Sequence, residues 1–199
     1  MREIEVKYQV LDREALLLAL KERGVWLSEP VWQDDQAYAP AGWDFGDDKT
    51  GVAFARLRTA GGCHTFTVKR PDLNAQSCTE RETEVMDREA MHEAVQLMGY
   101  RPTVRVAKTR RTGMLDGVEL CLDDLEGVGL FMELERIVPD GADEAAVQEE
   151  MAALVATLGV EMERTSATYD ALVRRHWGRL GRWGRIAATT CSGGSAPTW

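Results

Sequence analysis

The sequence predicts an α+β fold in which about eight short strands form a closed antiparallel β-barrel and helices pack on its outside. Two observations carry this prediction. Short stretches in which apolar and polar residues alternate recur along most of the chain, and turn residues separate them. In contrast, few segments have the apolar spacing of an amphipathic helix. Many short strands with few helices are typical of a sheet that closes on itself.

The predicted strands have a period of two residues, as expected when one face of each strand is buried. The first covers residues 1–8, where Ile4 and Val6 alternate with charged residues. Turn pairs such as Gly61-Gly62 and Asp116-Gly117 separate later strands. Those strands are predicted at 33–38, 53–58, 64–70, 79–85, 101–109, 118–123 and 130–137.

Three helices are predicted, at 12–24, at 87–99 and at about 143–158. Each follows a strand that carries acidic residues two positions apart, and each ends at a glycine. In the first, Asp12 is placed as an N-cap and Gly24 as the residue that ends the helix. The helices present apolar stripes that need an apolar surface to cover: Leu16 with Leu20, Val95 with Met98, and Leu154 with Leu158.

Length and composition indicate one globular domain. The chain has 199 residues, of which 44% are hydrophobic and 29% are charged. We divide it into a barrel domain at 1–176 and a flexible extension at 177–199, because the last segment is rich in Gly, Ser and Arg and has no periodic apolar face.

No apolar run is long enough to span a bilayer, and the N-terminus has no apolar signal segment, so a cytoplasmic protein without a membrane partner is expected. The four cysteines are not spaced as a metal site, and reduced thiols are expected.

The net charge disfavours nucleic acid as a partner. The formal charge is −9, and five of the 24 basic residues follow Val173, where no acidic residue occurs. The body of the chain is therefore more acidic than the whole, and it should repel a polyanion unless its basic groups are clustered. The position of the remaining Lys and Arg residues becomes the central question.

Charged side chains occupy one face of strand after strand. In the first strand Glu3, Glu5 and Lys7 share a face, and Ile4 and Val6 occupy the other. The same one-sided placement applies to Arg56 with Arg58, to Lys69 with Thr65 and Thr67, to Glu82 with Glu84, to Lys108 with Arg110, to Asp123, and to Glu133 with Glu135. A solvated outer face explains any one of these strands. It does not explain the set, because the helix stripes need the apolar faces, which leaves the charged faces inside the barrel.

A barrel interior that holds both signs of charge is costly unless it contains water, metal and a charged ligand. Arg and Lys donate hydrogen bonds to phosphate oxygens. Carboxylates two residues apart on a strand share a hard cation such as Mg²⁺. Both kinds of group in one cavity indicate phosphoryl-transfer chemistry on a polyanion.

These motifs resemble the CYTH, or triphosphate tunnel metalloenzyme, superfamily over about residues 2–172. The first strand, Glu3-x-Glu5-x-Lys7, is similar to the E-x-E-x-K signature of that family. The other matches follow in the family's order: Gln33-Asp34-Asp35, Arg56-Leu57-Arg58, Thr67-Val68-Lys69-Arg70-Pro71, Arg81-Glu82-Thr83-Glu84, Lys108-Thr109-Arg110, the block from Leu122-Asp123 to Glu133-Leu134-Glu135, and Ser166 to Leu172. The final block and the turn Trp43-Asp44-Phe45 most resemble the class IV adenylyl cyclase branch. Ala37 departs from the pattern, because it stands where the family usually has an aromatic residue.

The resemblance implies a role for each matched residue. Glu3, Glu5, Glu133 and Glu135, with Asp123 nearby, would hold one or two Mg²⁺ or Mn²⁺ ions. Phosphate oxygens would bind to Lys7, Arg56, Arg58, Lys69, Lys108 and Arg110. Glu82 and Glu84 would assist the metal or orient the basic groups. The catalytic residues would be Glu3, Glu5, Lys7, Glu133 and Glu135.

Three functions remain open at this stage. The first is an adenylyl cyclase, a lyase that converts ATP into cyclic AMP and pyrophosphate. The second is a hydrolase of inorganic, thiamine or nucleoside triphosphate. The third is a binding module for triphosphate or polyphosphate without catalysis, although such a module would need only the basic residues. The resemblance also implies a possible homodimer.

Some residues could serve the substrate or only the fold. Trp26, Trp32 and Trp43 are candidates to stack on an adenine at the barrel mouth, but for each of them taken singly packing beneath loops is the favoured explanation. Tyr169 is expected to anchor the last segment.

Overall fold

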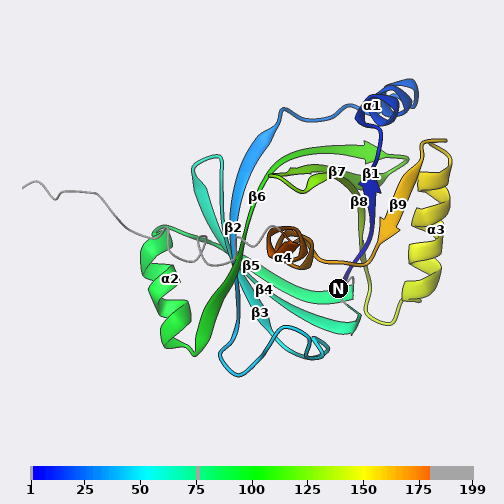
Figure 1. The fold of residues 1–199 in the computed structure, drawn as a ribbon. Coiled ribbons are helices and arrows are strands. Elements are labelled where there is room, and N and C mark those ends of the chain that lie inside the picture. Colours follow the sequence, from blue (N-terminus) through cyan, green and yellow to red (C-terminus); the bar gives the residue numbers. More distant parts are fainter. Residues whose placement is uncertain (1, 75–76, 180–199) are drawn as a thin grey trace, which may run out of the picture.

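The computed structural model describes residues 2–74 and 77–179, and Figure 1 shows their arrangement. The described chain contains nine strands in one antiparallel sheet, in the order β5-β4-β3-β2-β6-β7-β8-β1-β9. The strands are β1 (Arg2–Val10), β2 (Val31–Pro40), β3 (Phe54–Ala60), β4 (Cys63–Asn74), β5 (Ser77–Val85), β6 (Tyr100–Leu115), β7 (Val118–Leu125), β8 (Gly129–Val138) and β9 (Met162–Thr165). The helices are α1 (Arg13–Glu22), α2 (Arg88–Leu97), α3 (Glu144–Ala156) and α4 (Tyr169–Arg179).

A second pairing of β1 closes the sheet into a barrel. One edge of β1 pairs with β8 along most of its length. The other edge is shared: Glu3 and Ile4 pair with β5, and residues 7–10 pair with β9. Eight strands therefore form the closed ring and β9 lies outside it. The predicted α+β barrel of about eight antiparallel strands is confirmed.

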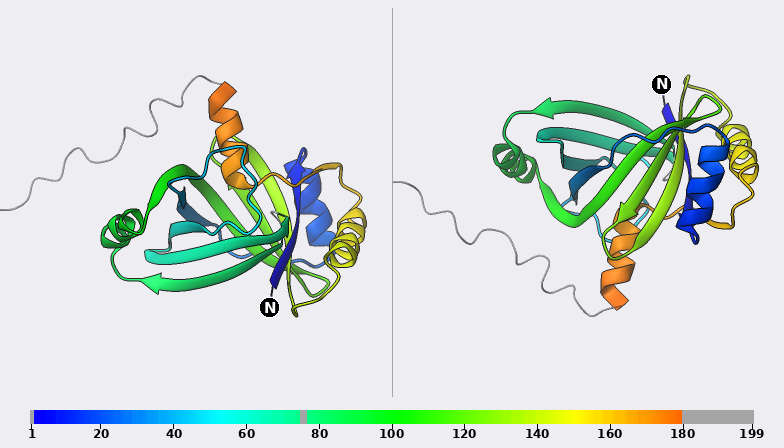
Figure 2. Two further views of the ribbon diagram at one scale, coloured as in Figure 1. Left: turned by 90° about the horizontal axis from the view of Figure 1, so that it is seen from below. Right: turned by 90° about the horizontal axis from the view of Figure 1, so that it is seen from above.

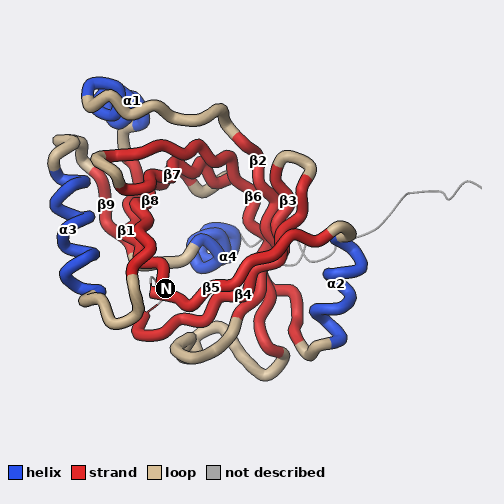
Figure 3. The backbone as a smooth tube through the Cα atoms, turned by 180° about the vertical axis from the view of Figure 1, so that it is seen from behind, coloured by secondary structure: helices blue, strands red, loops and turns tan. Residues whose placement is uncertain are grey.

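Helices cover two flanks of the barrel, as the apolar stripes predict (Figure 3). Helices α1 and α3 lie on one flank, where Leu16 and Met151 join a buried cluster with the outward residues Ile4, Val6 and Leu134. Helix α2 lies on the opposite flank, where its Val95 packs with residues of β2 and β3. Each of these helices begins at an aspartate N-cap: Asp12, Asp87 and Asp143.

Helix α4 contacts the barrel in a different way, because it packs against residues that face inward. Val173 of α4 clusters with Val106 of β6 and Phe131 of β8, and Val106 also lines the interior of the barrel. Figure 1 shows α4 in front of the barrel interior, and Figure 2 shows that it projects from one end. The start of α4 therefore covers one mouth of the barrel.

Strand β9 and helix α4 are additions to the elements predicted from the sequence. Both lie in the segment after Gly159, where apolar periodicity is weak. Helix α4 extends to Arg179, so residues 177–179 of the predicted extension form its last turn, and residues 180–199 lie outside the described residues. Within the described ranges, no helix is both long and apolar enough to cross a membrane. Among the described residues, Cys63, Cys78 and Cys121 form no disulfide bond, and Cys191 lies outside the described ranges.

Candidate active site

A cavity of about 550 Å³ occupies the barrel interior. Side chains from the ring strands and from the start of α4 line it, because alternate residues of each strand point inward. Most of the charged residues predicted from the sequence lie in this lining: Glu3, Glu5, Lys7, Arg56, Arg58, Lys69, Glu82, Lys108, Arg110, Glu133 and Glu135. The expected inward direction of the charged faces is therefore observed.

Three carboxylates gather on neighbouring strands at one side of the cavity. Oxygen atoms of Glu5, Glu133 and Glu135 all lie within 4.8 Å of one another. Glu5 of β1 pairs in register with Glu135 of β8, and Glu133 is two residues away on the same face. Three carboxylate oxygens at this spacing suit a hard divalent cation such as Mg²⁺ or Mn²⁺.

A second group of possible ligands shares Glu135. It consists of Glu119, Cys121 and Glu135, which meet the same spacing. Cys121 is fully buried and offers a soft sulfur atom, whereas Mg²⁺ and Mn²⁺ prefer oxygen. The group with three carboxylates therefore fits these ions better.

Asp123 organises a buried set of charges at the floor of the cavity. Arg110 donates from Nε to Asp123 at 2.8 Å, and Lys108 Nζ lies 3.0 Å from the same carboxylate. Arg110 also donates to Glu133 at 2.6 Å, and Glu133 lies 3.0 Å from Lys7 Nζ. We call these residues the buried network: Lys7, Lys108, Arg110, Asp123 and Glu133. Every charge in it has an opposite charge in contact, as burial requires.

Tyr169, at the start of α4, completes the buried network. Its hydroxyl donates to Asp123 at 2.8 Å. The Lys7 and Lys108 ammonium groups lie 4.4 and 4.6 Å from the centre of its ring. Two cations held against one ring gain electrostatic stabilisation from its π-system. Tyr169 thus joins helix α4 to the charged floor of the cavity.

Burial and mutual charge shift the pKa values of this region. Burial raises the pKa of Glu135, and the neighbouring Glu133 carboxylate raises it further. Burial acts on Glu133 in the same direction, but Lys7 and Arg110 outweigh it and hold the pKa of Glu133 well below its usual value. Burial, followed by repulsion from Arg110, lowers the pKa of Lys108 to about 8. Like charges therefore lie close together in this region: Glu133 beside Glu135, and Lys108 beside Arg110. A bound cation would reduce the repulsion between the carboxylates, and a bound polyanion would reduce the repulsion between the cations.

The opposite wall of the cavity carries a more open set of charges. Lys69 Nζ lies 2.6 Å from Glu80 and 3.4 Å from Glu3. Arg56 Nη2 lies 3.3 Å from Glu82. We call these five residues the open network: Glu3, Arg56, Lys69, Glu80 and Glu82. The Arg56 and Lys69 side chains are 23% and 32% exposed to solvent, whereas those of Lys7 and Lys108 are 4% and 2% exposed.

One donor of the open network has no acceptor. The Nε atom of Arg56 is buried and makes no hydrogen bond within the described residues. A buried guanidinium N–H without a partner is costly and is normally satisfied. Arg56 lines the cavity with the exposed 23% of its side chain, whereas the Nε atom itself is buried.

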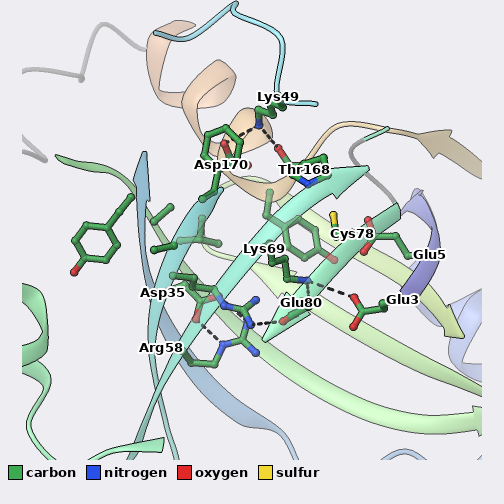
Figure 4. Close-up of a pocket in the computed structure, with 18 of the residues that line it drawn as sticks. Glu3, Glu5, Asp35, Lys49, Arg58, Lys69, Cys78, Glu80, Thr168 and Asp170 are labelled. Carbon is green, nitrogen blue, oxygen red and sulfur yellow. Dashed lines mark hydrogen bonds and ion pairs between the residues drawn. The ribbon is translucent and has the colours of Figure 1, made fainter. Parts of the chain in front are cut away.

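Arg58 is held separately by Asp35. Its Nε and Nη2 atoms donate to the two carboxylate oxygens, both at 2.7 Å. Figure 4 shows this pair beside the group formed by Lys69, Glu80 and Glu3. The two-point contact fixes the guanidinium plane. Arg58 therefore presents its remaining N–H groups in a defined direction.

The comparisons with known proteins agree with this architecture. The model of the CYTH domain family matches residues 1–169. This chain belongs to the CYTH domain family. A protein of Methanocaldococcus jannaschii named putative adenylate cyclase is 28% identical over 165 residues, which cover 82% of this chain and 93% of that protein.

Solved structures share the CYTH fold. The PH1819 protein of Pyrococcus horikoshii is 24% identical, with a TM-score of 0.72 over 87% of this chain and 98% of that one. A Hippeastrum protein, described as a putative adenylyl cyclase with a dominant triphosphatase activity, is 17% identical, with a TM-score of 0.59 over 88% of this chain and 96% of that one. These likenesses concern the fold.

Two of the predicted site residues of this CYTH domain lie away from the cavity surface. Asp123 is fully buried behind the lining, where cations and Tyr169 surround it. Glu84 is exposed on β5, opposite Thr65, and is not part of the lining. The proposed metal ligand Glu3 contacts Lys69 and is not in the group of three carboxylates.

The structure also adds residues that the sequence analysis did not select. Glu80 shares the inward face of β5 with Glu82, and this parity was the available signal. Asp35 stands in the Gln33-Asp34-Asp35 motif, but only the structure shows its contact with Arg58. Lys49, in the connection between β2 and β3, lines the cavity, and no periodic pattern marks it.

Proposed function

We propose that this protein is a divalent-metal-dependent enzyme that binds a triphosphate group in the barrel cavity and converts ATP into cyclic AMP and pyrophosphate. The observation that carries the proposal is the arrangement of charge in one cavity. The carboxylates Glu5, Glu133 and Glu135 stand on β1 and β8, and cationic side chains face the same space from β3, β4 and β6.

The metal would bind at Glu5, Glu133 and Glu135. The three carboxylates supply the oxygen ligands that Mg²⁺ and Mn²⁺ prefer. A divalent ion held there would neutralise charge on phosphate oxygens during the reaction.

Cations on β3, β4 and β6 would hold the phosphate chain. The Arg56 side chain is 23% exposed, and Lys69 is the most exposed of the paired lysines in the two networks. Arg58 and Arg110 line the same cavity, and Asp35 and Asp123 orient their guanidinium groups. Fixed donors aimed at phosphate oxygens stabilise the charge that develops in phosphoryl transfer.

In the proposed cyclase reaction, the ribose 3′-oxygen forms a bond to the α-phosphorus, and the bond from that phosphorus to the bridging oxygen of the β-phosphate breaks. Pyrophosphate leaves, and the hydroxyl proton passes to a carboxylate of the cavity. The relative from Methanocaldococcus jannaschii, whose name is putative adenylate cyclase, supports the choice of this reaction.

A triphosphatase is the second candidate. The same metal group and cations would also bind a triphosphate whose terminal phosphorus is attacked by water. Binding of the triphosphate does not by itself select the phosphorus atom that reacts. The description of the Hippeastrum protein, which names a dominant triphosphatase activity, keeps this reaction open for the chain.

Product analysis decides between the candidates. Purified protein is incubated with ATP, and separately with inorganic triphosphate, in the presence of Mg²⁺ or Mn²⁺, and the products are separated by chromatography. Cyclic AMP with an equal amount of pyrophosphate is the expected result. Free phosphate without a cyclic product would replace the cyclase with a triphosphatase.

The variant Glu133→Gln provides a control for contaminating activity, because it removes one charge from the proposed metal group. Turnover should fall while the wild-type protein, purified in the same way, stays active. Binding of both triphosphates without turnover of either would favour a binding module and would contradict the proposed enzyme.

A further inference from the structure

One end of the cavity differs in chemistry from the rest. There, side chains of β2, β3 and the connection between them are aromatic or apolar, and they include Trp43, Phe45 and Phe54. The Trp43 ring contacts both phenylalanine rings edge to face, at centroid distances of 5.3 and 5.0 Å. This aromatic end adjoins the start of α4, because Thr168, Tyr169 and Asp170 line the same cavity.

Lys49 is a cation that lies beside the aromatic end of the cavity. Its Nζ atom lies 5.8 Å from the centre of the Trp43 ring and 5.6 Å from that of Phe54. Its polar contacts are Thr168 Oγ1, in the residue before α4, at 3.3 Å and Asp170 Oδ2, in the first turn of α4, at 3.4 Å. Figure 4 shows Lys49 with these two partners across the pocket from the Asp35–Arg58 pair and from Lys69.

Lys49 is held more loosely than the cations of the buried network. Lys7 and Lys108 each contact a carboxylate at 3.0 Å and are almost fully buried. Lys49 contacts Asp170 at 3.4 Å, and both side chains keep about a quarter of their exposure, 28% and 26%. A partly exposed ion pair at this distance contributes little to stability, so a stronger anion can replace the carboxylate.

We propose that Lys49 is a further substrate-binding residue, which leaves Asp170 and binds a phosphate oxygen next to the organic group of an organic triphosphate. The inference rests on the proposed function of the cavity. The aromatic end would receive the organic group, and Lys49 is the cation that lines the cavity at that end. Inorganic triphosphate has no group for the aromatic end, so it would be held by the deeper cations without Lys49.

Equilibrium binding of two ligands to the variant Lys49→Met tests the assignment. The ligands are inorganic triphosphate and an ATP analogue with a methylene group between the α- and β-phosphorus atoms, both titrated calorimetrically with Mg²⁺. Loss of one charge-assisted contact should weaken the binding of the analogue about ten-fold. The affinity for inorganic triphosphate should stay within about two-fold of the wild type, because Lys49 would not contact it.

The variant Asp170→Asn separates binding from a structural role. If Lys49 binds substrate, loss of its resting partner should leave the affinity for the analogue unchanged or higher. If Lys49 only ties the loop to α4, both variants should weaken both ligands and lower the thermal unfolding midpoint alike, and the inference fails. The matched control is Lys21→Met on α1, an exposed lysine outside the cavity lining.

Failure of this inference and failure of the proposed function give different results. A wild-type protein that binds both ligands but forms no product from ATP or from inorganic triphosphate contradicts the enzyme, yet the loss in Lys49→Met still supports the binding role of Lys49. A wild-type protein that binds inorganic triphosphate but not the analogue overturns the role of Lys49 and leaves a triphosphatase possible. Equal affinities of Lys49→Met and wild type for the analogue overturn it as well.

Discussion

The two charged networks of the barrel contain similar residues in different surroundings. In the buried network, Lys108 and Arg110 contact the fully buried Asp123, and Tyr169 completes the set. In the open network, Arg56 and Lys69 contact glutamates but remain about a quarter to a third exposed, and the Arg56 Nε atom has no acceptor among the described residues.

This difference indicates separate tasks. A fully paired, buried network holds its geometry because any unpaired charge in it would be costly. An exposed pair can exchange its carboxylate for phosphate at little cost. We therefore expect the buried network to govern stability and the position of the metal group, and the open network to govern ligand affinity. Four experiments test this comparison.

Asp123→Asn should have the largest effect, and it should act on stability. The substitution leaves Lys108 and Arg110 without their shared carboxylate charge, which should reduce the free energy of unfolding by about 3–5 kcal/mol. Urea unfolding measures the change. The neighbouring variant Asp124→Asn is the control, because Asp124 pairs with Arg13 on the surface and should cost less than about 1 kcal/mol. Equal losses in the two variants would contradict the distinction between the networks.

Glu5→Gln should reduce activity and weaken activation by metal. Of the two candidate metal groups, Glu5 belongs only to the one with three carboxylates. Removal of one group that stabilises charge in a transition state typically lowers turnover by about 100-fold or more. We therefore expect Glu5→Gln to lower turnover at fixed Mn²⁺ about 100-fold. The measurement is product formation during a Mn²⁺ titration, started from protein treated with a chelator.

Glu119→Gln is the matched variant for the metal group. Glu119 belongs only to the group that includes Cys121, so its substitution should change the Mn²⁺ titration little. A larger effect from Glu119→Gln than from Glu5→Gln would move the metal to the group with the thiol.

Arg56→Met should weaken triphosphate binding with little loss of stability. One guanidinium contact to phosphate should be worth about 1.5–3 kcal/mol, or roughly ten-fold or more in affinity. Calorimetric titration with inorganic triphosphate measures the loss. Arg81→Met on β5 is the control, because Arg81 is exposed and outside the lining. A large drop in unfolding free energy without a change in affinity would assign Arg56 to the structure instead.

Thr67→Val should have the smallest effect. Thr67 is fully buried, donates to Glu82 at 2.7 Å and accepts from Arg56 at 3.1 Å, so it positions one pair of the open network. Loss of these hydrogen bonds in an isosteric variant should cost about 1 kcal/mol in the free energy of triphosphate binding. Thr65→Val, on the same face of β4, serves as the comparison and should change the affinity less. Equal effects would show that Thr67 does not position Arg56.

Much of the barrel could be predicted from the sequence, because strand alternation is a local property. The pattern Glu3-x-Glu5-x-Lys7 places charge on one face and apolar residues on the other, whatever the rest of the chain does. The helix stripes then require the apolar faces to point outward. The start of α4 could not be predicted in this way, because the segment after Gly159 has no sustained period and Tyr169 depends on distant partners.

The closed antiparallel barrel, its charged interior and the family of the chain could all be predicted from the pattern of residues along the sequence. Which cations are already paired depends on how the chain folds. Lys7 meets Glu133 because β1 pairs with β8, and Lys49 meets Asp170 because α4 returns to the barrel mouth. Residue type and spacing fix the face on which a charge lies, whereas its partner and its exposure depend on strand register and on contacts between segments more than 100 residues apart.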